Sequence, residues 1–434
     1  MLIIVTLFIF AIIICTFKSF GRFITPTSVF CCSLFAACCS AISFQKKWGY
    51  EMSELTALMI MSGVFIFLFG ALLARINFKN KSHNVQRDNK PMYLDINNVI
   101  LIGFILFQIV SYYFQISYIK QYAGINDLFL ASAYYDQQSK YGEISDFIYP
   151  VWTARGIFLS KIISYFILYW LARSISFPFT TKKSTKHLLW IDFIISTLAC
   201  LITGSRGTAI DFILVLILMV IFMKQSDVVR YGIPYKIIIP SIMGIIILLY
   251  FFQDFADLLG REGTSSINAS DYFGMYLGGQ IPLLDQALET PHFTKEWGRL
   301  TFSKLIYPEM PSLYNDLFPM GNIHGHPLGN VYTIFATLYY DFGFFGALLY
   351  LFILSFILQY LYEYYSAYPS KYLNKLFPIL FFYFFIEYET MVFAYFANRS
   401  TAIFDGNFIR MIIYMVICIP ILKKVGIRFK KLNS

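Results

Sequence analysis

One long polar segment, residues 252–329, holds most of the side chains in this chain that are suited to chemistry. It contains three of the five histidines, His292, His324 and His326, together with Arg261 and Arg299. The segment has no apolar stretch of about 18 residues, so it is expected to lie outside a bilayer. We therefore expect the functional site in this segment.

Arg261 and Arg299 are candidates for binding an anion. The segment also holds Lys295, Lys304 and nine acidic residues, so ordinary surface pairing is the simpler interpretation. Guanidinium forks match the geometry of a diphosphate better than ammonium groups do. This difference favours the two arginines over the two lysines as ligands of a diphosphate.

His324 and His326 form a His-x-His pair within residues 322–330, Asn-Ile-His-Gly-His-Pro-Leu-Gly-Asn. No third ligand stands at a useful spacing, so we expect no metal and no other cofactor. A neutral imidazole can act as a general base near pH 7. His326 is the first candidate for this role and His324 the second, and Asp341 or Glu289 is the carboxylate alternative. A solvated loop histidine without a function is the simpler interpretation.

A second motif lies at residues 203–208, Thr-Gly-Ser-Arg-Gly-Thr, between two apolar runs. Gly204 and Gly207 permit a tight turn, whose backbone N–H groups could hold an anion together with Arg206. The alternative is an arginine that snorkels from a turn. Basic residues are disfavoured in short outer loops, which raises the weight of the functional interpretation.

The composition predicts that membrane-spanning segments position these residues. Hydrophobic residues make up 58% of the chain and charged residues 14%, and the mean hydropathy is +0.62. A soluble domain carries about 25% charged residues. The composition therefore predicts an integral membrane protein. Its net charge of +9 resides in short connections that set topology, so no nucleic-acid partner is expected.

The apolar runs predict an all-α polytopic membrane protein, a single membrane domain over 1–434 with about eleven transmembrane helices. Two outer loops interrupt it, a smaller one at 118–156 and the large one at 252–329 that carries the site. The expected spans are 2–17, 24–44, 55–74, 97–117, 157–175, 188–203, 208–223, 237–252, 343–362, 376–397 and 405–422.

Lysines and arginines predict the orientation of these spans. Alternate connections and the C-terminal tail contain 21 of the 34 basic residues, which assigns them to the cytoplasmic side. The 75–95 loop and the C-terminus are then cytoplasmic. The N-terminus and both large loops lie outside.

Residues 330–346 predict a helix at the outer interface followed by a turn. Asn330 opens this run, and Asp341, Gly343 and Gly346 interrupt it before the next span.

Six ionisable residues fall inside expected spans, where such groups are paired or functional by default. They are Lys161, Asp192, Asp211, Glu387, Glu389 and Arg410. Pairing of a glutamate with Arg410 or Arg399 is the preferred structural explanation.

Three features together resemble the Wzy-type O-antigen polymerases, which polymerise oligosaccharide repeat units. They are Thr-Gly-Ser-Arg-Gly at 203–207, the long outer loop, and the pair Gly-Asn-Val-Tyr-Thr at 329–333 and Tyr-Asp-Phe-Gly-x-x-Gly at 340–346. The resemblance covers the whole chain in topology and about 25 residues in motif. It implies a helical fold related to the O-antigen ligases, and 11 or 12 spans.

The resemblance also implies a reaction at the periplasmic face of a bacterial inner membrane. A growing glycan on undecaprenyl diphosphate is transferred to a new lipid-linked repeat unit, without nucleotide sugar or metal. Arginines would bind the diphosphate leaving group, and a base would activate the attacking hydroxyl. A flippase and a chain-length regulator would be partners. The alternatives are an O-antigen ligase and a non-enzymatic flippase or transporter of lipid-linked oligosaccharide.

Overall fold

The computed structural model describes residues 1–22, 24–81, 92–141, 149–203, 206–231, 269–289, 297–302, 305, 318–400 and 406–430. Helices dominate these residues, and the short strands form two antiparallel pairs. Eight of the described helices are long and apolar enough to cross a membrane. The predicted class, an all-α polytopic membrane protein, is therefore confirmed.

The eight membrane-length helices match eight of the expected spans. They are α1 (Leu2–Phe20), α2 (Pro26–Trp48), α3 (Glu54–Lys81), α4 (Asn98–Ala123), α6 (Val151–Ser176), α8 (Arg206–Tyr231), α15 (Ile334–Ala367) and α18 (Gly406–Lys424). Two further expected spans correspond to shorter helices, α7 (Lys183–Ala199) and α17 (Ile379–Thr390). The span expected at 237–252 lies outside the described residues. The total of eleven stays a prediction.

The chain forms two compact units. Unit 1 comprises Met1–Arg87, Asn268–Ala367 and Ile386–Ile409. Unit 2 comprises Asp88–Ile267, Tyr368–Phe385 and Arg410–Ser434. Each unit is therefore assembled from segments that are far apart in the sequence.

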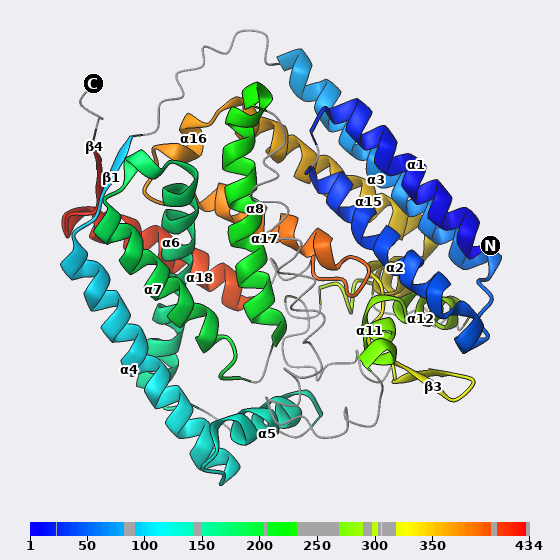
Figure 1. The fold of residues 1–434 in the computed structure, drawn as a ribbon, viewed down its shortest axis with the longest axis horizontal. Coiled ribbons are helices and arrows are strands. Elements are labelled where there is room, and N and C mark those ends of the chain that lie inside the picture. Colours follow the sequence, from blue (N-terminus) through cyan, green and yellow to red (C-terminus); the bar gives the residue numbers. More distant parts are fainter. Residues whose placement is uncertain are drawn as a thin grey trace. The chain divides into compact units, whose positions relative to one another are not determined.

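In unit 1, α15 packs along α3, and the two helices run side by side (Figure 1). Gly70 allows their close approach, since a Cβ atom there would lie 2.7 Å from the Phe352 carbonyl oxygen. Small residues let membrane helices approach in this way. The 34 residues of α15 include a break at Gly343, where φ is 68° and ψ is −175°. The remaining 24 residues span about 36 Å, enough for one crossing.

Helix α2 carries signals at both ends. Thr25 caps its start, in a capping box with Ser28, and Pro26 occupies the first helical position. Gly49 ends the helix in a left-handed conformation with φ 61°. The chain therefore turns sharply after Trp48, and the carbonyl group of Trp48 is available to another segment.

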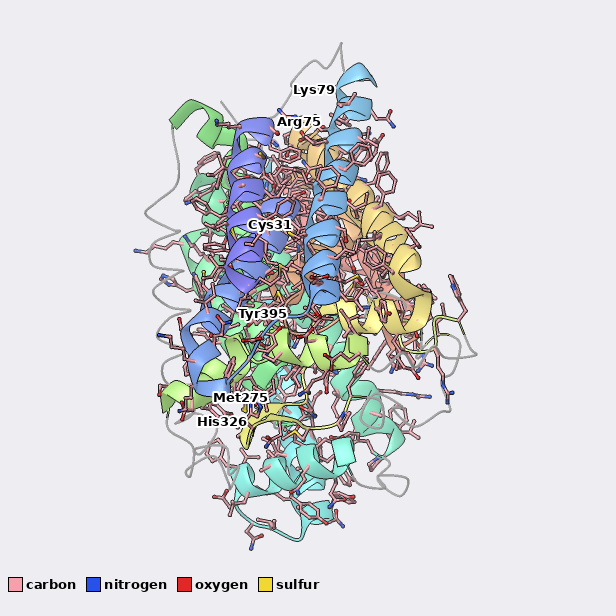
Figure 2. All side chains as sticks on the ribbon, turned by 90° about the vertical axis from the view of Figure 1, so that its right-hand side faces the viewer. Cys31, Arg75, Lys79, Met275, His326 and Tyr395 are labelled. Carbon is pink, nitrogen blue, oxygen red and sulfur yellow. The ribbon has the colours of Figure 1, made fainter. Side chains whose placement is uncertain are left out.

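The described part of the large polar segment forms a layer at one end of unit 1. It contains α11 (Ala269–Leu277), α12 (Gln280–Glu289) and the hairpin of β2 (Gly321–Ile323) and β3 (His326–Gly329). Figure 2 shows Met275 and His326 at the end of the unit opposite to Arg75 and Lys79. Arg75 and Lys79, which belong to a connection expected on the cytoplasmic side, thus lie at the end of the unit opposite to the outer layer.

Unit 2 contains α4, α6, α7 and α8, which pack against one another, with α4 contacting α6 and α7 and α6 contacting α8. The smaller outer loop, expected at 118–156, contains a helix, α5 (Leu128–Tyr141). A two-stranded ribbon pairs β1 (Tyr93–Asp95) with β4 (Arg428–Lys430). The short helices η2 (Pro178–Thr180) and α16 (Ser370–Leu373) complete the described elements around it.

Arg173 organises this end of unit 2. Its side chain is fully buried and donates hydrogen bonds to Leu373 O at 3.0 Å, to Thr180 Oγ1 at 3.1 Å and to Met92 O. Its guanidinium also lies 4.8 Å from the centre of the Phe429 ring. Arg173 thus ties four segments of the chain together, around Met92, Thr180, Leu373 and Phe429.

Candidate functional site

The described site residues of unit 1 gather in the outer layer and at the start of α15. Asp341 lies near the end of the first part of α15, two residues before the break at Gly343. Its side chain is buried, with 5% of the residue exposed. Its Oδ1 accepts a hydrogen bond from Leu300 N at 3.0 Å, and its Oδ2 accepts one from Thr301 N at 2.5 Å. Both carboxylate oxygens are therefore engaged. Asp341 closes the turn of residues 297–302 onto α15.

An aromatic cluster covers the same turn. Trp297 packs edge-on against Phe342 at 4.8 Å, and Phe302 lies 6.1 Å from Trp297 and 6.2 Å from Phe342, between ring centres. Gly298 has φ 73°, so the turn needs a residue that tolerates the left-handed region. Trp297 stays 68% exposed, which gives this face an aromatic surface outside the core.

The closed turn fixes the backbone of Arg299. Arg299 is half-buried and lies within electrostatic range of Tyr340, the residue before Asp341. The Tyr340 ring lies 6.1 Å from Phe318, which in turn packs on Tyr332 at 4.6 Å. Arg299 therefore stands beside a group of aromatic rings at the entry to α15. Of the three arginines expected to bind diphosphate, it is the one whose side chain the structure describes.

Tyr332 joins this group to the hairpin. Its hydroxyl donates a hydrogen bond to Pro319 O at 3.0 Å. Burial raises the pKa of Tyr332 to about 12, so the hydroxyl stays protonated at neutral pH. Asn330, half-buried, lies between β3 and Tyr332, at the point where the chain leaves the hairpin for α15.

His324 occupies the tip of the β2–β3 hairpin and is oriented by α2. Its Nδ1 lies 2.9 Å from Trp48 O. A carbonyl oxygen can only accept, so Nδ1 carries the proton and Nε2 is left as the basic nitrogen of the neutral ring. The ring also packs on Gly49, where a Cβ atom would lie 3.0 Å from Nδ1. The backbone of His324 has φ 48°, an uncommon value for a residue other than glycine.

His326 differs from His324 in its surroundings. It stands on β3 opposite Ile323 and is half-buried. Its ring makes no hydrogen bond to the residues that the structure describes. The structure therefore gives a defined tautomer to His324, the second choice from the sequence, and none to His326.

Asp285 anchors the outer layer to the membrane helices. Its carboxylate, 6% exposed, accepts hydrogen bonds from Ser53 N at 3.1 Å and from the hydroxyls of Ser53 and Thr56. Both partners lie at the start of α3, so α12 is fixed to that helix end. Burial, and secondarily Asp285, raise the pKa of Tyr50 in the same corner. Sequence reasoning did not single out Asp285, because its partners lie more than 200 residues away.

Gln286 extends this anchor to the hairpin. Its Nε2 donates to Asn322 O at 3.2 Å, and Gly321 packs on Leu283 of α12. The hairpin that presents His324 is therefore held from two sides, by α12 and by the end of α2. No signal in the sequence pointed to the Trp48 carbonyl, since any residue type could supply it.

The remaining predicted residues belong to unit 2 or lie outside the described residues. Arg206 is the first residue of the 26-residue helix α8, and Gly207 follows it in the helix. Gly207, expected in the turn, is thus a helical residue, because α8 begins at Arg206. Gly204 and Arg261 lie outside the described residues, as does His292.

Two further observations concern charge and metals. Among the described residues, no three His, Cys, Asp or Glu side chains gather at a spacing suited to a metal ion.

Glu387 of α17 is 4% exposed, and neither carboxylate oxygen has a hydrogen-bond partner in the described part of the chain. Glu387 is therefore not paired with an arginine among the described residues, and the expected pairing of one glutamate with Arg410 or Arg399 stays a prediction for Glu389.

Fold and composition together define a multi-pass α-helical membrane protein with a structured layer at one end of unit 1. Compared with known proteins, the chain matches no family model, no curated protein and no solved structure. The arguments for a function therefore rest on the residues themselves.

Proposed function

We propose that this protein polymerises undecaprenyl-diphosphate-linked oligosaccharide repeat units at the periplasmic face of a bacterial inner membrane. The observation that carries the proposal is the closed turn that holds Arg299 beside Tyr340 at the entry to α15. An arginine fixed near a membrane entry is suited to a lipid diphosphate, the leaving group of this reaction.

Arg206 supports the same proposal from unit 2. It begins α8, and the N-terminus of a long helix favours negative charge through its free N–H groups and its dipole. A basic side chain at that position adds to the attraction for a phosphate. We assign Arg206 and Arg299 to diphosphate binding, and we expect the same role for Arg261.

His324 is the proposed general base. The Trp48 carbonyl fixes the neutral tautomer with its free Nε2. In the proposed step Nε2 takes the proton of the acceptor hydroxyl. The hydroxyl oxygen forms the new glycosidic bond at the anomeric carbon of the donor, and the bond to the lipid diphosphate breaks. Asp341, whose oxygens both accept hydrogen bonds, acts as a positioning residue for the Arg299 turn.

The exposed ring of Trp297 gives the donor or acceptor glycan a surface for stacking. An interfacial tryptophan that only anchors the protein in lipid is the alternative role. Loss of polymer length in Trp297→Ala, with insertion unchanged, would separate the two.

Reconstitution tests the proposal directly. Purified protein in liposomes is given a synthetic undecaprenyl-diphosphate oligosaccharide, and products are separated as a ladder. We expect a ladder from the wild type, none from Arg299→Ala, and a weak one from Arg299→Lys, which lacks the bidentate fork. Lys47→Ala, which removes an exposed ion pair with Asp271 in the same layer, is the matched control and should polymerise normally.

Other outcomes point to the other candidates. A single transfer onto a lipid A core, without a ladder, would make the protein a ligase. Movement of the lipid-linked sugar across the bilayer without bond formation would make it a flippase. Either result would overturn the proposal.

A further inference from the structure

A buried polar cluster of unit 2 includes none of the residues assigned to glycan chemistry. It joins Gln108 of α4, Ser160 and Ser164 of α6, and Asp192 and Ser196 of α7. All five residues are buried, and Asp192 is fully so. Gln108, Ser160 and Asp192 each lie 9 or 10 residues from their helix start, about 14–15 Å along it. This depth is close to the middle of a bilayer about 30 Å thick.

Within the described residues, the carboxylate of Asp192 lacks a counter-charge. Its Oδ1 accepts a hydrogen bond from Ser196 Oγ at 3.4 Å, and the amide of Gln108 is a second hydrogen-bonding neighbour. Its recorded neighbours in the described part of the chain are the uncharged side chains of Ser196, Gln108 and Tyr112, with no basic side chain among them. An unpaired carboxylate is expensive at this depth and is expected to hold a proton or a cation.

More than one buried oxygen in the cluster is left without a partner. Asp192 Oδ2, Gln108 Oε1 and Ser160 Oγ, one on each of the three helices, have no hydrogen-bond partner among the described residues. A single proton on Asp192 would satisfy one of these oxygens. A cation that several oxygens coordinate would satisfy them together.

The spacing of the cluster also fits a cation. Na⁺ has about the size of Ca²⁺, which holds its oxygen ligands at about 2.3–2.6 Å. Two ligand oxygens at right angles around such an ion lie about 3.3–3.7 Å apart. Ser196 Oγ lies 3.4 Å from Asp192 Oδ1 and 3.4 Å from Gln108 Nε2, and a half-turn of the amide would bring Oε1 to that position. The distance from Ser196 Oγ to Asp192 Oδ1 is longer than a good hydrogen bond to a carboxylate.

We propose that Asp192, Ser196, Gln108 and Ser160 form a binding site for Na⁺ between α4, α6 and α7. One carboxylate balances one monovalent charge, whereas a divalent ion would leave a net charge in the membrane interior. Hydroxyl, amide and carboxylate oxygens are the ligands that hard cations prefer. Sodium sites at the level of the bilayer midplane are known in transporters. The bound ion would hold the three helices together.

Binding of radioactive sodium to the purified protein in detergent tests this site. We expect saturable binding of one ion per chain, competed by unlabelled Na⁺ and not by choline. Asp192→Asn should abolish it. Asp127→Asn, an exposed aspartate at the start of α5 in the same unit, is the control and should bind as the wild type does.

Ser160→Ala separates ion binding from folding. Ser160 Oγ makes no hydrogen bond to the described residues, so its loss should leave thermal unfolding without sodium unchanged. It should weaken sodium binding about tenfold. The absence of saturable sodium binding by the wild-type protein would overturn the proposal. This holds also if low pH stabilises the protein, because a proton on Asp192 would then take the place of the ion. Asp192→Asn with wild-type affinity, or Ser160→Ala with wild-type affinity, would overturn it as well.

Discussion

Replacement of Asp341 offers the sharpest test of how the outer layer is built. Its carboxylate accepts two backbone N–H groups of the 297–302 turn and is 5% exposed. Hydrogen bonds to a charged group contribute about 1.5–3 kcal/mol each. Asp341→Ala should therefore cost about 3 kcal/mol or more, an increase of about 10²-fold in the population of the open turn. Asp341→Asn keeps one acceptor and should cost about half as much.

Limited trypsinolysis measures this opening, because the turn contains Arg299. When opening and closing are fast, the rate of cleavage follows the population of the open turn. Mass spectrometry of the peptide that ends at Arg299 then reports the ratio between variant and wild type. Asp271→Ala is the matched control: this aspartate also lies in the outer layer, but its ion pair with Lys47 is partly exposed. Such pairs contribute about 0–1 kcal/mol, at most about a fivefold change.

Two results would contradict this reasoning. If Asp341→Ala opened the turn no more than Asp271→Ala does, the carboxylate would not be the group that closes it. If Asp341→Asn lost all polymer while Arg299 stayed protected, Asp341 would be the general base and not a positioning residue.

Three further predictions concern other parts of the chain. His324→Ala should lower the polymerisation rate about 10²–10⁴-fold, whereas His326→Ala should retain most of it, and equal losses in the ladder assay would refute the assignment. Gly343→Ala should lower the free energy of unfolding by about 1–3 kcal/mol, because essentially only glycine adopts φ 68° with ψ −175° without strain. A thermal unfolding curve identical to that of the wild type would disprove this. The hydrogen bond from Lys430 lowers the pKa of Asp95, so the pair stabilises the β1–β4 ribbon above the unfolded pKa of about 3.9 and loses this effect as pH falls through the folded value. Proteolysis of the C-terminal tail should then rise a few-fold at acid pH in the wild type but not in Asp95→Asn.

The sequence by itself determined the class of protein and the elements that build it. Runs of about 20 apolar residues must form helices in a bilayer, because each backbone group there needs a hydrogen bond within its own segment. Local signals also predicted the break before the long part of α15, since the positive φ of Gly343 is a property of one residue.

Only the tertiary structure decided how the candidate site is assembled. The ring of His324 is oriented by the carbonyl of Trp48, about 280 residues away, and a carbonyl leaves no mark on residue type. From the sequence alone, Asp341 is a carboxylate available for chemistry. In the structure, its two oxygens accept hydrogen bonds from the backbone N–H groups of a turn about 40 residues earlier. Asp192 is linked through Ser196 of its own helix to side chains of two other helices, Gln108 of α4 and Ser164 of α6. The chemistry of a side chain is fixed by its neighbours in space, and pairing between distant segments has no local periodicity that a sequence can display.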